Sequence, residues 1–127
     1  MTSRRQARRQ ALFLLYQWDL SGAEIGSQYA GEIDPWALEL AEETAAQSAE
    51  LDERITAASE GWTADRLGVV ERSALRVAIQ ELDRGDVPFE VAINEAVAFT
   101  KRYASEDGAR LVNGILGRIQ REGAVSG

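Results

Sequence analysis

The chain has 127 residues and a formal net charge of −7, with 14 basic side chains against 21 acidic ones and neither histidine nor cysteine. The lack of cysteine excludes disulfides and thiolate metal sites, and the lack of histidine removes the usual general base near neutral pH. We therefore expect a binding protein with no catalytic residue, metal or cofactor. No apolar run could span a membrane and the start lacks the apolar core of a signal peptide, so we expect a cytoplasmic protein with a single domain over residues 1–127.

The basic side chains gather at the start of this acidic chain, where four arginines lie within six residues: Arg4, Arg5, Arg8 and Arg9. Between residues 19 and 60, eleven acidic side chains face Arg54 alone, and the remainder from residue 61 is close to neutral. Arginine binds planar, bidentate partners, so such a cluster is typical of a phosphate-binding patch on a nucleic-acid-binding protein. The alternative is an end that only improves solubility.

The arginines lead directly into a first helix, expected at about residues 3–21 with Thr2 or Ser3 as its N-cap and Gly22 at its end. At about 100° per residue, one stripe of this helix faces the core and contains Ala7, Ala11, Leu14 and Trp18. The arginines occupy the neighbouring sector, which Tyr16 extends two turns further along. A basic face with an aromatic ring suits single-stranded RNA, and the alternative is that Tyr16 packs against a neighbouring helix.

The middle of the chain is helical after an irregular stretch. Residues 23–33 are irregular or hold a short helix. Asp34-Pro35 then supplies an N-cap followed by proline at the first helical position. The helix that follows is expected to bend or restart around residues 47–48 and to end at Gly61, with an apolar stripe of Trp36, Leu40, Ala41, Thr44, Leu51, Ile55 and Ala58.

Three further helices are expected after a short turn capped by Thr63. The first covers about residues 69–82, is apolar over much of its surface and should therefore be central, stopping at Gly85. The second covers about residues 91–103. The third, capped by Ser105, is expected to face inward with Leu111, Val112, Ile115, Leu116 and Ile119. The sequence predicts an all-α fold of about six or seven helices, arranged as two helical subdomains that share one core.

Two short motifs place polar or small residues inside the last two expected helices. Asn94 and Glu95 lie in the middle of a helix, and we interpret them as a surface pair or as an Asn94 bond to a loop backbone. Gly114 lies inside the last helix, where glycine costs about 1 kcal/mol relative to alanine. We therefore expect a close helix–helix crossing at Gly114 and a buried hydrogen bond at Asn113.

The order of the motifs is more specific than any one of them. They are Arg4-Arg5-Gln6-Ala7-Arg8, Leu15-Tyr16-Gln17-Trp18, Val70-Glu71-Arg72, Val91-Ala92-Ile93-Asn94-Glu95-Ala96 and Val112-Asn113-Gly114-Ile115-Leu116. In this order and at this spacing they resemble the NusB family of transcription antitermination factors. The resemblance covers nearly the whole chain and is weakest between residues 23 and 34.

This resemblance implies an all-helical protein that binds the boxA element of nascent ribosomal RNA together with a small ribosomal protein, NusE. Such a protein acts within the RNA polymerase antitermination complex and supports transcription of rRNA operons. The resemblance assigns RNA contacts to Arg4, Arg5, Arg8, Arg9, Tyr16 and Asp107. It assigns Glu71 to the contact with the ribosomal protein, and the wider acidic surface would suit such a basic partner.

The chain departs from the family pattern at Leu111, where many relatives have an aromatic residue that can stack on a base. Arg110 is our candidate for a planar RNA-binding group in its place. The segment after Gly22 is also short, which puts any partner contact there in doubt. Family members differ in oligomeric state, so a homodimer that covers the arginine face stays open.

Two other functions stay open at this point. One is a helical adaptor that binds only proteins, with the arginines on an acidic partner. The other is a NusB-like domain of the kind found in some RNA cytosine methyltransferases, in which case catalysis requires a domain outside this sequence. Selectivity for an RNA sequence separates the adaptor from an antitermination factor, because an adaptor should have none.

Overall fold

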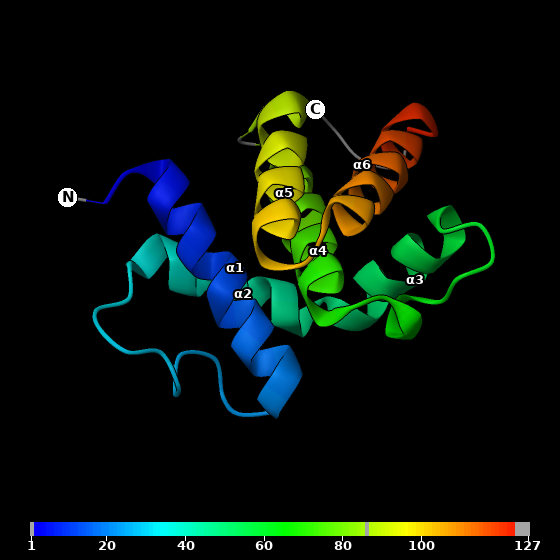
Figure 1. The fold of residues 1–127 in the computed structure, drawn as a ribbon. Coiled ribbons are helices and arrows are strands. Elements are labelled where there is room, and N and C mark those ends of the chain that lie inside the picture. The colour runs from blue at the N-terminus through cyan, green and yellow to red at the C-terminus, as the bar shows by residue number, and fades with distance from the viewer. Residues whose placement is uncertain (1, 86, 124–127) are drawn as a thin grey trace.

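The computed structural model describes residues 2–85 and 87–123, and every regular element within them is helical (Figure 1). In chain order these are α1 (Arg4–Ser21), α2 (Pro35–Ala46), α3 (Ser48–Ala58), the short 3₁₀ helix η1 (Ala64–Arg66), α4 (Val69–Arg84), α5 (Phe89–Tyr103) and α6 (Glu106–Arg121). The prediction of an all-α fold is confirmed. None of the helices in this described part combines the length and apolarity that crossing a membrane requires.

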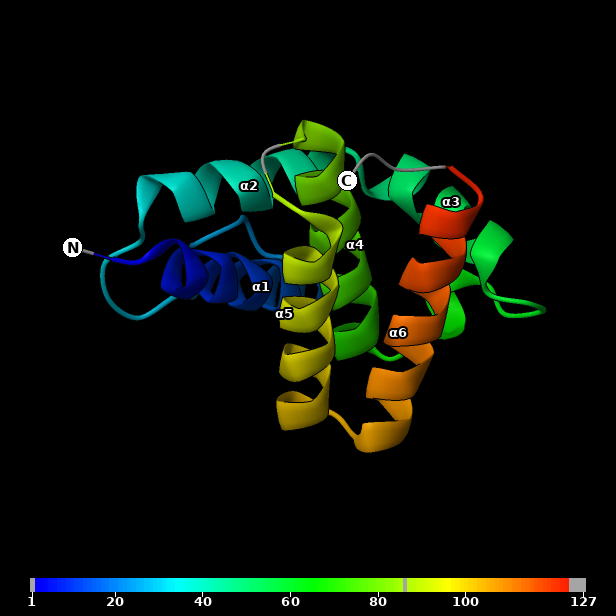
Figure 2. The ribbon, with the colours of Figure 1, turned by 90° about the horizontal axis from the view of Figure 1, so that it is seen from above.

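Helix α4 lies at the centre of the fold, in contact with all five other α-helices. Helices α1 and α2 lie on one side of it and α3 and α6 on the other, while α5 lies alongside α4 and next to α6 (Figures 1 and 2). Residues 73–79 of α4 are buried without interruption, as expected for the central helix. The buried side chains form one cluster, to which Leu14, Leu40, Leu75 and Leu116 contribute from different helices.

The helix ends follow the capping signals in the sequence. Ser3 and Gln6 form a capping box at the start of α1, and Gly22 ends this helix with φ of 74°. Asp34 caps α2, because its Oδ1 accepts from the backbone N–H groups of Trp36 and Ala37 at 2.8 and 3.4 Å. The expected bend around residues 47–48 is a break between α2 and α3, with Gln47 outside both helices.

Two expectations about the connections are confirmed in position but differ in detail. Thr63 lies at the N-cap of η1 without a side-chain bond to the helix backbone. Its hydroxyl instead bonds to Asp65 and, as the largest effect, lowers the pKa of that carboxyl. Helix α5 begins two residues earlier than expected, at Phe89, because Pro88 has the extended backbone of an N-cap. Residues 23–33 contain a turn and no helix.

Three expectations for the last helix are wrong. Leu111 was expected to face inward but is 36% exposed. The buried side of α6 contains Val112, Ile115, Leu116 and Ile119. Position 111 points about 100° away from Val112 around the helix axis and therefore lies outside this stripe. Gly114 is exposed, and a Cβ atom at this position would have no other heavy atom within 4 Å. Asn113 is exposed as well. Among the described residues no helix crosses at this point, so packing explains neither Asn113 nor Gly114.

The close approach that we expected at Gly114 occurs at Gly108, six residues earlier in α6. A Cβ atom at Gly108 would lie 2.8 Å from Oε2 of Glu71 on α4. Gly68, just before α4, approaches the same carboxylate, with 2.6 Å between a Cβ and Oε1. The half-buried side chain of Glu71 therefore occupies the space that two glycines leave open.

Asp34→Ala should lower the free energy of unfolding by about 1 kcal/mol, because the first N–H groups of α2 lose their acceptor. Urea unfolding followed by circular dichroism measures this change. Asp34→Ser retains a capping oxygen and should cost much less. Equal losses in the two variants would mean that the cap does not stabilise α2.

Candidate nucleic-acid interface

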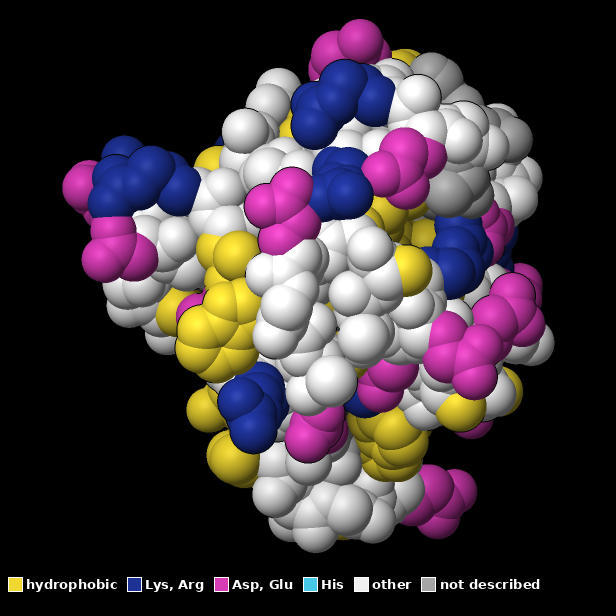
Figure 3. Space-filling view, turned by 90° about the vertical axis from the view of Figure 1, so that its right-hand side faces the viewer, with side chains coloured by type: hydrophobic (Ala, Val, Ile, Leu, Met, Phe, Trp, Pro, Cys, Tyr) yellow, Lys and Arg dark blue, Asp and Glu magenta, His cyan; other side chains and the backbone are white. Residues whose placement is uncertain are grey.

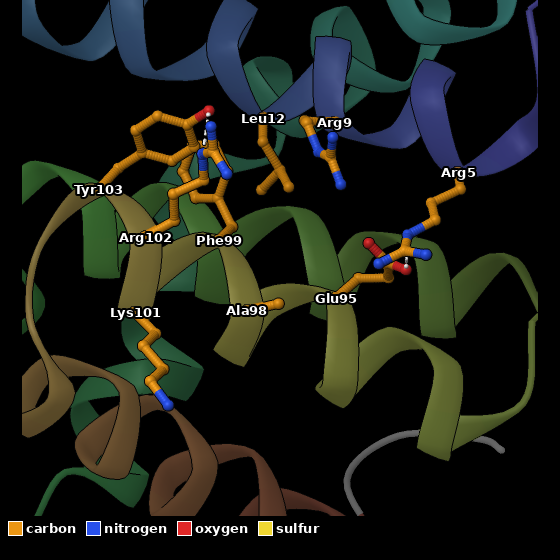
Figure 4. Close-up of a pocket in the computed structure, with 9 residues that line it drawn as sticks. All are labelled: Arg5, Arg9, Leu12, Glu95, Ala98, Phe99, Lys101, Arg102 and Tyr103. Atoms are coloured by element: carbon orange, nitrogen blue, oxygen red, sulfur yellow. Dashed lines mark hydrogen bonds and ion pairs between the residues drawn. The ribbon is translucent and has the colours of Figure 1, made fainter.

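A groove of about 310 Å³ lies between α1 and α5 (Figure 4). Arg5 and Arg9 line it from α1, since residues four apart lie on the same face of a helix, and both side chains are exposed. The capping box at Ser3 begins the helix just before these arginines, so both project from a fixed backbone. The guanidinium of Arg5 reaches Glu95 on α5, and the side chain of Arg9 points into the groove (Figure 4).

The last turn of α5 supplies the opposite wall through Lys101, Arg102 and Tyr103. Nε of Arg102 donates to the hydroxyl of Tyr103 at 3.1 Å, and the guanidinium carbon lies 5.5 Å from the centre of the Tyr103 ring. Tyr103 remains 41% exposed. The groove therefore combines four cationic side chains with an accessible aromatic ring.

An aromatic cluster joins α1 to α5 beside this groove. Phe13 of α1 lies edge-on to Phe99 and Tyr103 of α5, with ring centres 5.2 and 4.9 Å apart. Phe99 and Tyr103 are themselves 5.0 Å apart. Aromatic pairs at these distances are favourable beyond the area that they bury. The cluster therefore holds the Tyr103 ring in place while leaving part of its surface accessible.

One carboxylate partly neutralises the groove. Nε of Arg5 lies 3.1 Å from Oε1 of Glu95, whose side chain is only 17% exposed (Figure 4). The mid-helix Glu95 of the sequence motif thus pairs across the groove with α1, while its neighbour Asn94 is exposed. A ligand phosphate that binds Arg5 must compete with this carboxylate.

The expectation that all four arginines of α1 lie on one exposed face is wrong for Arg8. Arg8 is 6% exposed, and its Nε and Nη2 donate to the two carboxylate oxygens of Glu81 on α4 at 2.6 and 2.5 Å. At about 100° per residue, positions 5 and 9 lie about 60° and 100° to one side of position 8, which faces α4, and position 4 lies about 40° to the other side. The buried, bidentate pair makes Arg8 a structural residue that joins α1 to the central helix.

Arg4 is exposed but does not line the groove. Its guanidinium carbon lies 4.2 Å from the centre of the Trp36 ring on α2, a distance typical of a cation–π contact. Tyr16 is half-buried, about two turns along α1 from Arg9, and is not among the groove residues. Of the five α1 residues that the sequence singled out, only Arg5 and Arg9 therefore meet in the groove.

Asp107 and Arg110 lie on the first turns of α6 and form an exposed ion pair with each other. A second hollow, of about 560 Å³, lies between α5 and α6 and is lined in part by Lys101, Arg110 and Asn113. Because Lys101 lines both hollows, they are neighbours. The predicted positions on α1 and α6 are thus linked along the end of α5. Glu71 lies apart from the grooves, in the first turn of α4.

Lys101, Arg102 and Tyr103 were missed by the sequence analysis. Two adjacent cations followed by an aromatic residue can indicate a nucleic-acid-binding site. The same pattern is also typical of the last turn of a helix, where basic residues are common. Only the packing of α5 beside α1 shows that these residues line the same groove as Arg5 and Arg9. Within the described residues, no three acidic side chains are grouped in a way that could hold a metal ion.

The fold and the groove define a class, namely an all-helical protein with a basic, aromatic surface of the kind that binds nucleic acid. The family model for the "NusB family" matches residues 5–121. The transcription antitermination protein NusB of Solibacter usitatus is 35% identical over an alignment that covers 96% of this chain and 91% of that protein. The chain belongs to the NusB family.

Solved structures agree with this assignment. The crystal structure of the antitermination factors NusB and NusE in complex with double-stranded RNA matches at a TM-score of 0.81 and 29% identity, covering 94% of this chain and 96% of that one. A crystal structure of a plectonemic RNA supercoil contains a chain that matches at a TM-score of 0.85 and 30% identity, with complete coverage of both chains. The expected family and fold are both confirmed.

Glu81→Ala should destabilise the protein by about 3–5 kcal/mol, because it leaves the guanidinium of Arg8 buried without its carboxylate. Chemical denaturation at constant protein concentration measures the change. Asp83→Ala is the matched control, since it removes a carboxylate from the same helix but from a more exposed pair with Arg54, and should cost at most about 1 kcal/mol. Similar losses in both variants would contradict a special role for the buried pair.

Proposed function

We propose that this protein is a non-catalytic transcription antitermination factor that binds the boxA element of nascent ribosomal RNA together with the small ribosomal protein NusE. Membership of the NusB family supports the proposal. The observation that carries it is the α1–α5 groove, in which Arg5 and Arg9 face the basic and aromatic end of α5. In this role the protein acts in the cytoplasm, as part of the antitermination complex on RNA polymerase during transcription of rRNA operons.

The groove suits single-stranded RNA in two ways. The guanidinium groups of Arg5, Arg9 and Arg102 bind phosphates through charge-assisted hydrogen bonds. The exposed face of Tyr103 stacks on a base, a contact worth about 1–3 kcal/mol in proteins that bind single strands. Because Phe13 and Phe99 already hold the Tyr103 ring, little ordering is needed when RNA binds.

The remaining predicted residues extend this contact. In our proposal the RNA continues from the α1–α5 groove past Lys101 to Arg110 and Asp107 on α6. Arg4 and Tyr16 contact RNA that leaves the groove along α1. Arg8 has no part in RNA binding, because Glu81 already occupies its guanidinium inside the protein.

Acidic side chains outside the α1–α5 groove suit the protein partner. The exposed sides of α2 and α3 carry the acidic side chains of Glu39, Glu42, Glu50 and Glu53. Glu71 adds a half-buried carboxylate at the start of α4. We propose that these carboxylates attract the basic NusE protein, with Glu71 in direct contact. The arginine groove stays available for RNA.

The proposal is tested by fluorescence anisotropy with a boxA-like RNA and a scrambled RNA of equal length, each with and without NusE. We expect tighter binding of the boxA-like RNA and a further gain when NusE is present. Equal binding of both RNAs under all conditions, together with binding of NusE, would favour the adaptor function. Light scattering of the same samples tests whether a homodimer covers the groove, since RNA should then dissociate the dimer.

Arg5→Ala and Arg9→Ala together should weaken binding of the boxA-like RNA by about tenfold or more, because two charge-assisted contacts are lost. The slope of log affinity against log salt should become shallower by about 1.4, or about 0.7 for each lost phosphate contact. Anisotropy titrations at several salt concentrations measure both quantities. Arg54→Ala on α3 is the control and should leave the slope unchanged; a shared change would exclude the α1–α5 groove as the site.

Glu95→Gln should strengthen RNA binding several-fold and steepen its salt dependence, because Arg5 loses a competing carboxylate. The substitution keeps the shape and hydrogen-bonding capacity of the side chain. In the Arg5→Ala background the same substitution should have a much smaller effect. A gain of equal size in both backgrounds would mean that Glu95 acts through general repulsion of RNA and not through Arg5.

A further inference from the structure

A third hollow, of about 470 Å³, lies between the end of α3 and the exposed side of α6. Trp62, in the connection after α3, lines it and is 53% exposed. Leu111 and Gly114 line it from α6. Figure 3 views the molecule from the side of α3 and α6, where hydrophobic side chains reach the surface between basic and acidic ones. We refer to this hollow as the Trp62 groove.

Packing does not account for the residues of the Trp62 groove. A large indole that leaves half its surface in water gains little from burial. Gly114 lowers the helix propensity of α6 by about 1 kcal/mol relative to alanine, yet no neighbouring side chain requires the space. The absence of a side chain at position 114 keeps the wall of the groove open beside Leu111.

The rim of the Trp62 groove is basic. Arg110, Arg118 and Arg121 line it from α6, and Glu60 is the one carboxylate among its lining residues. Arg118 is held by ion pairs with Glu60 and Glu122. The hydrogen bond that Arg118 donates to Glu122 is the largest of the effects that raise the pKa of Arg118. Arg121 has no ion-pair partner within the part of the chain that the structure describes, so its charge is available to a ligand.

The Trp62 groove is continuous with the proposed RNA path. Arg110 lines both the Trp62 groove and the α5–α6 hollow, and Lys101 lines both that hollow and the α1–α5 groove. A basic side chain therefore marks each junction between neighbouring hollows. A single strand that leaves the α1–α5 groove past Lys101 reaches Trp62 by way of Arg110. The acidic side chains along this path include Glu106 and Asp107 at the start of α6 and Glu60 beside Trp62.

We propose that Trp62 is a base-stacking residue for the RNA, and that the Trp62 groove holds a nucleotide beyond those bound between α1 and α5. The base stacks on the indole beside Leu111, and the adjoining phosphate binds Arg110 or Arg121. Trp62 thus provides, from the connection after α3, a ring that Leu111 cannot provide. This inference rests on the proposed function, since it extends the same RNA.

The positive charge of the Trp62 groove favours RNA over a basic protein as the occupant. Arg110 and Arg118 already form ion pairs, with Asp107 and with Glu60 and Glu122, whereas Arg121 has no ion-pair partner among the described residues. A basic ribosomal protein would bring cations against Arg121, which is unfavourable. An RNA strand brings one phosphate and one flat base per nucleotide, and the groove offers guanidinium groups and an indole.

The test uses the whole 127-residue chain and a series of boxA-like RNAs extended by one nucleotide at a time from either end. Anisotropy gives the affinity of wild type, Trp62→Ala, Trp62→Phe and, as a control, Leu20→Ala. Leu20 is 62% exposed at the end of α1, away from the grooves. Thermal melting verifies that each variant is folded.

We expect Trp62→Ala to weaken binding by about tenfold, but only for RNAs long enough to reach the groove. Trp62→Phe should retain most of the affinity and Leu20→Ala all of it. RNA of that length should also quench tryptophan emission in wild type, and Trp62→Phe should lose most of this quenching although Trp18 and Trp36 remain.

If wild type prefers the boxA-like RNA and Trp62→Ala matches it at every length, the inference is wrong and the proposed function stands. If Trp62→Ala weakens binding of NusE and not of RNA, the occupant is a protein and the inference is also wrong. If wild type binds boxA-like and scrambled RNA equally, the proposed function fails. A length-dependent loss in Trp62→Ala would then still support a stacking site.

Discussion

The buried ion pair between Arg8 and Glu81 determines how the first helix faces the rest of the molecule. A bidentate guanidinium–carboxylate contact has one favoured geometry, so it fixes both the position of α1 along α4 and the rotation of α1 about its own axis. Positions 5 and 9 lie about 60° and 100° to the same side of position 8 on the helix, so with Arg8 directed at α4 both Arg5 and Arg9 face α5. A rotation of one residue would move both out of the groove. The same pair that stabilises the fold therefore orients the groove.

Local signals in the sequence account for most of the fold. The capping box at Ser3, the N-cap at Asp34 and the glycines at 22 and 85 locate the helix ends, because these residues satisfy backbone groups or adopt positive φ without help from distant parts of the chain. The continuous apolar surface of residues 73–79 likewise predicts a central helix. Long-range packing is different: nothing in the sequence indicates which arginine meets Glu81, or that the end of α5 faces Arg5.

The errors at Arg8 and in the last helix have a common cause. Sequence patterns assume that charged residues near one another share an environment, and that a polar or small residue inside a helix serves packing. Arg8 breaks the first assumption, because its partner lies 73 positions away in the chain. Asn113 and Gly114 do not fit the second, since both are exposed and no helix of the described residues covers them. In each case the missing information is the position of another helix.

Arg8 is buried and Arg9 is exposed, and this difference determines which substitutions each position tolerates over evolution. Lysine can replace arginine where only positive charge near a phosphate is needed, as at Arg9. It cannot reproduce the two parallel hydrogen bonds that Arg8 makes inside the protein. The two adjacent arginines are thus under different constraints: folding constrains position 8, and ligand binding constrains position 9. Relatives should interchange the two basic residues freely at position 9 and keep arginine at position 8.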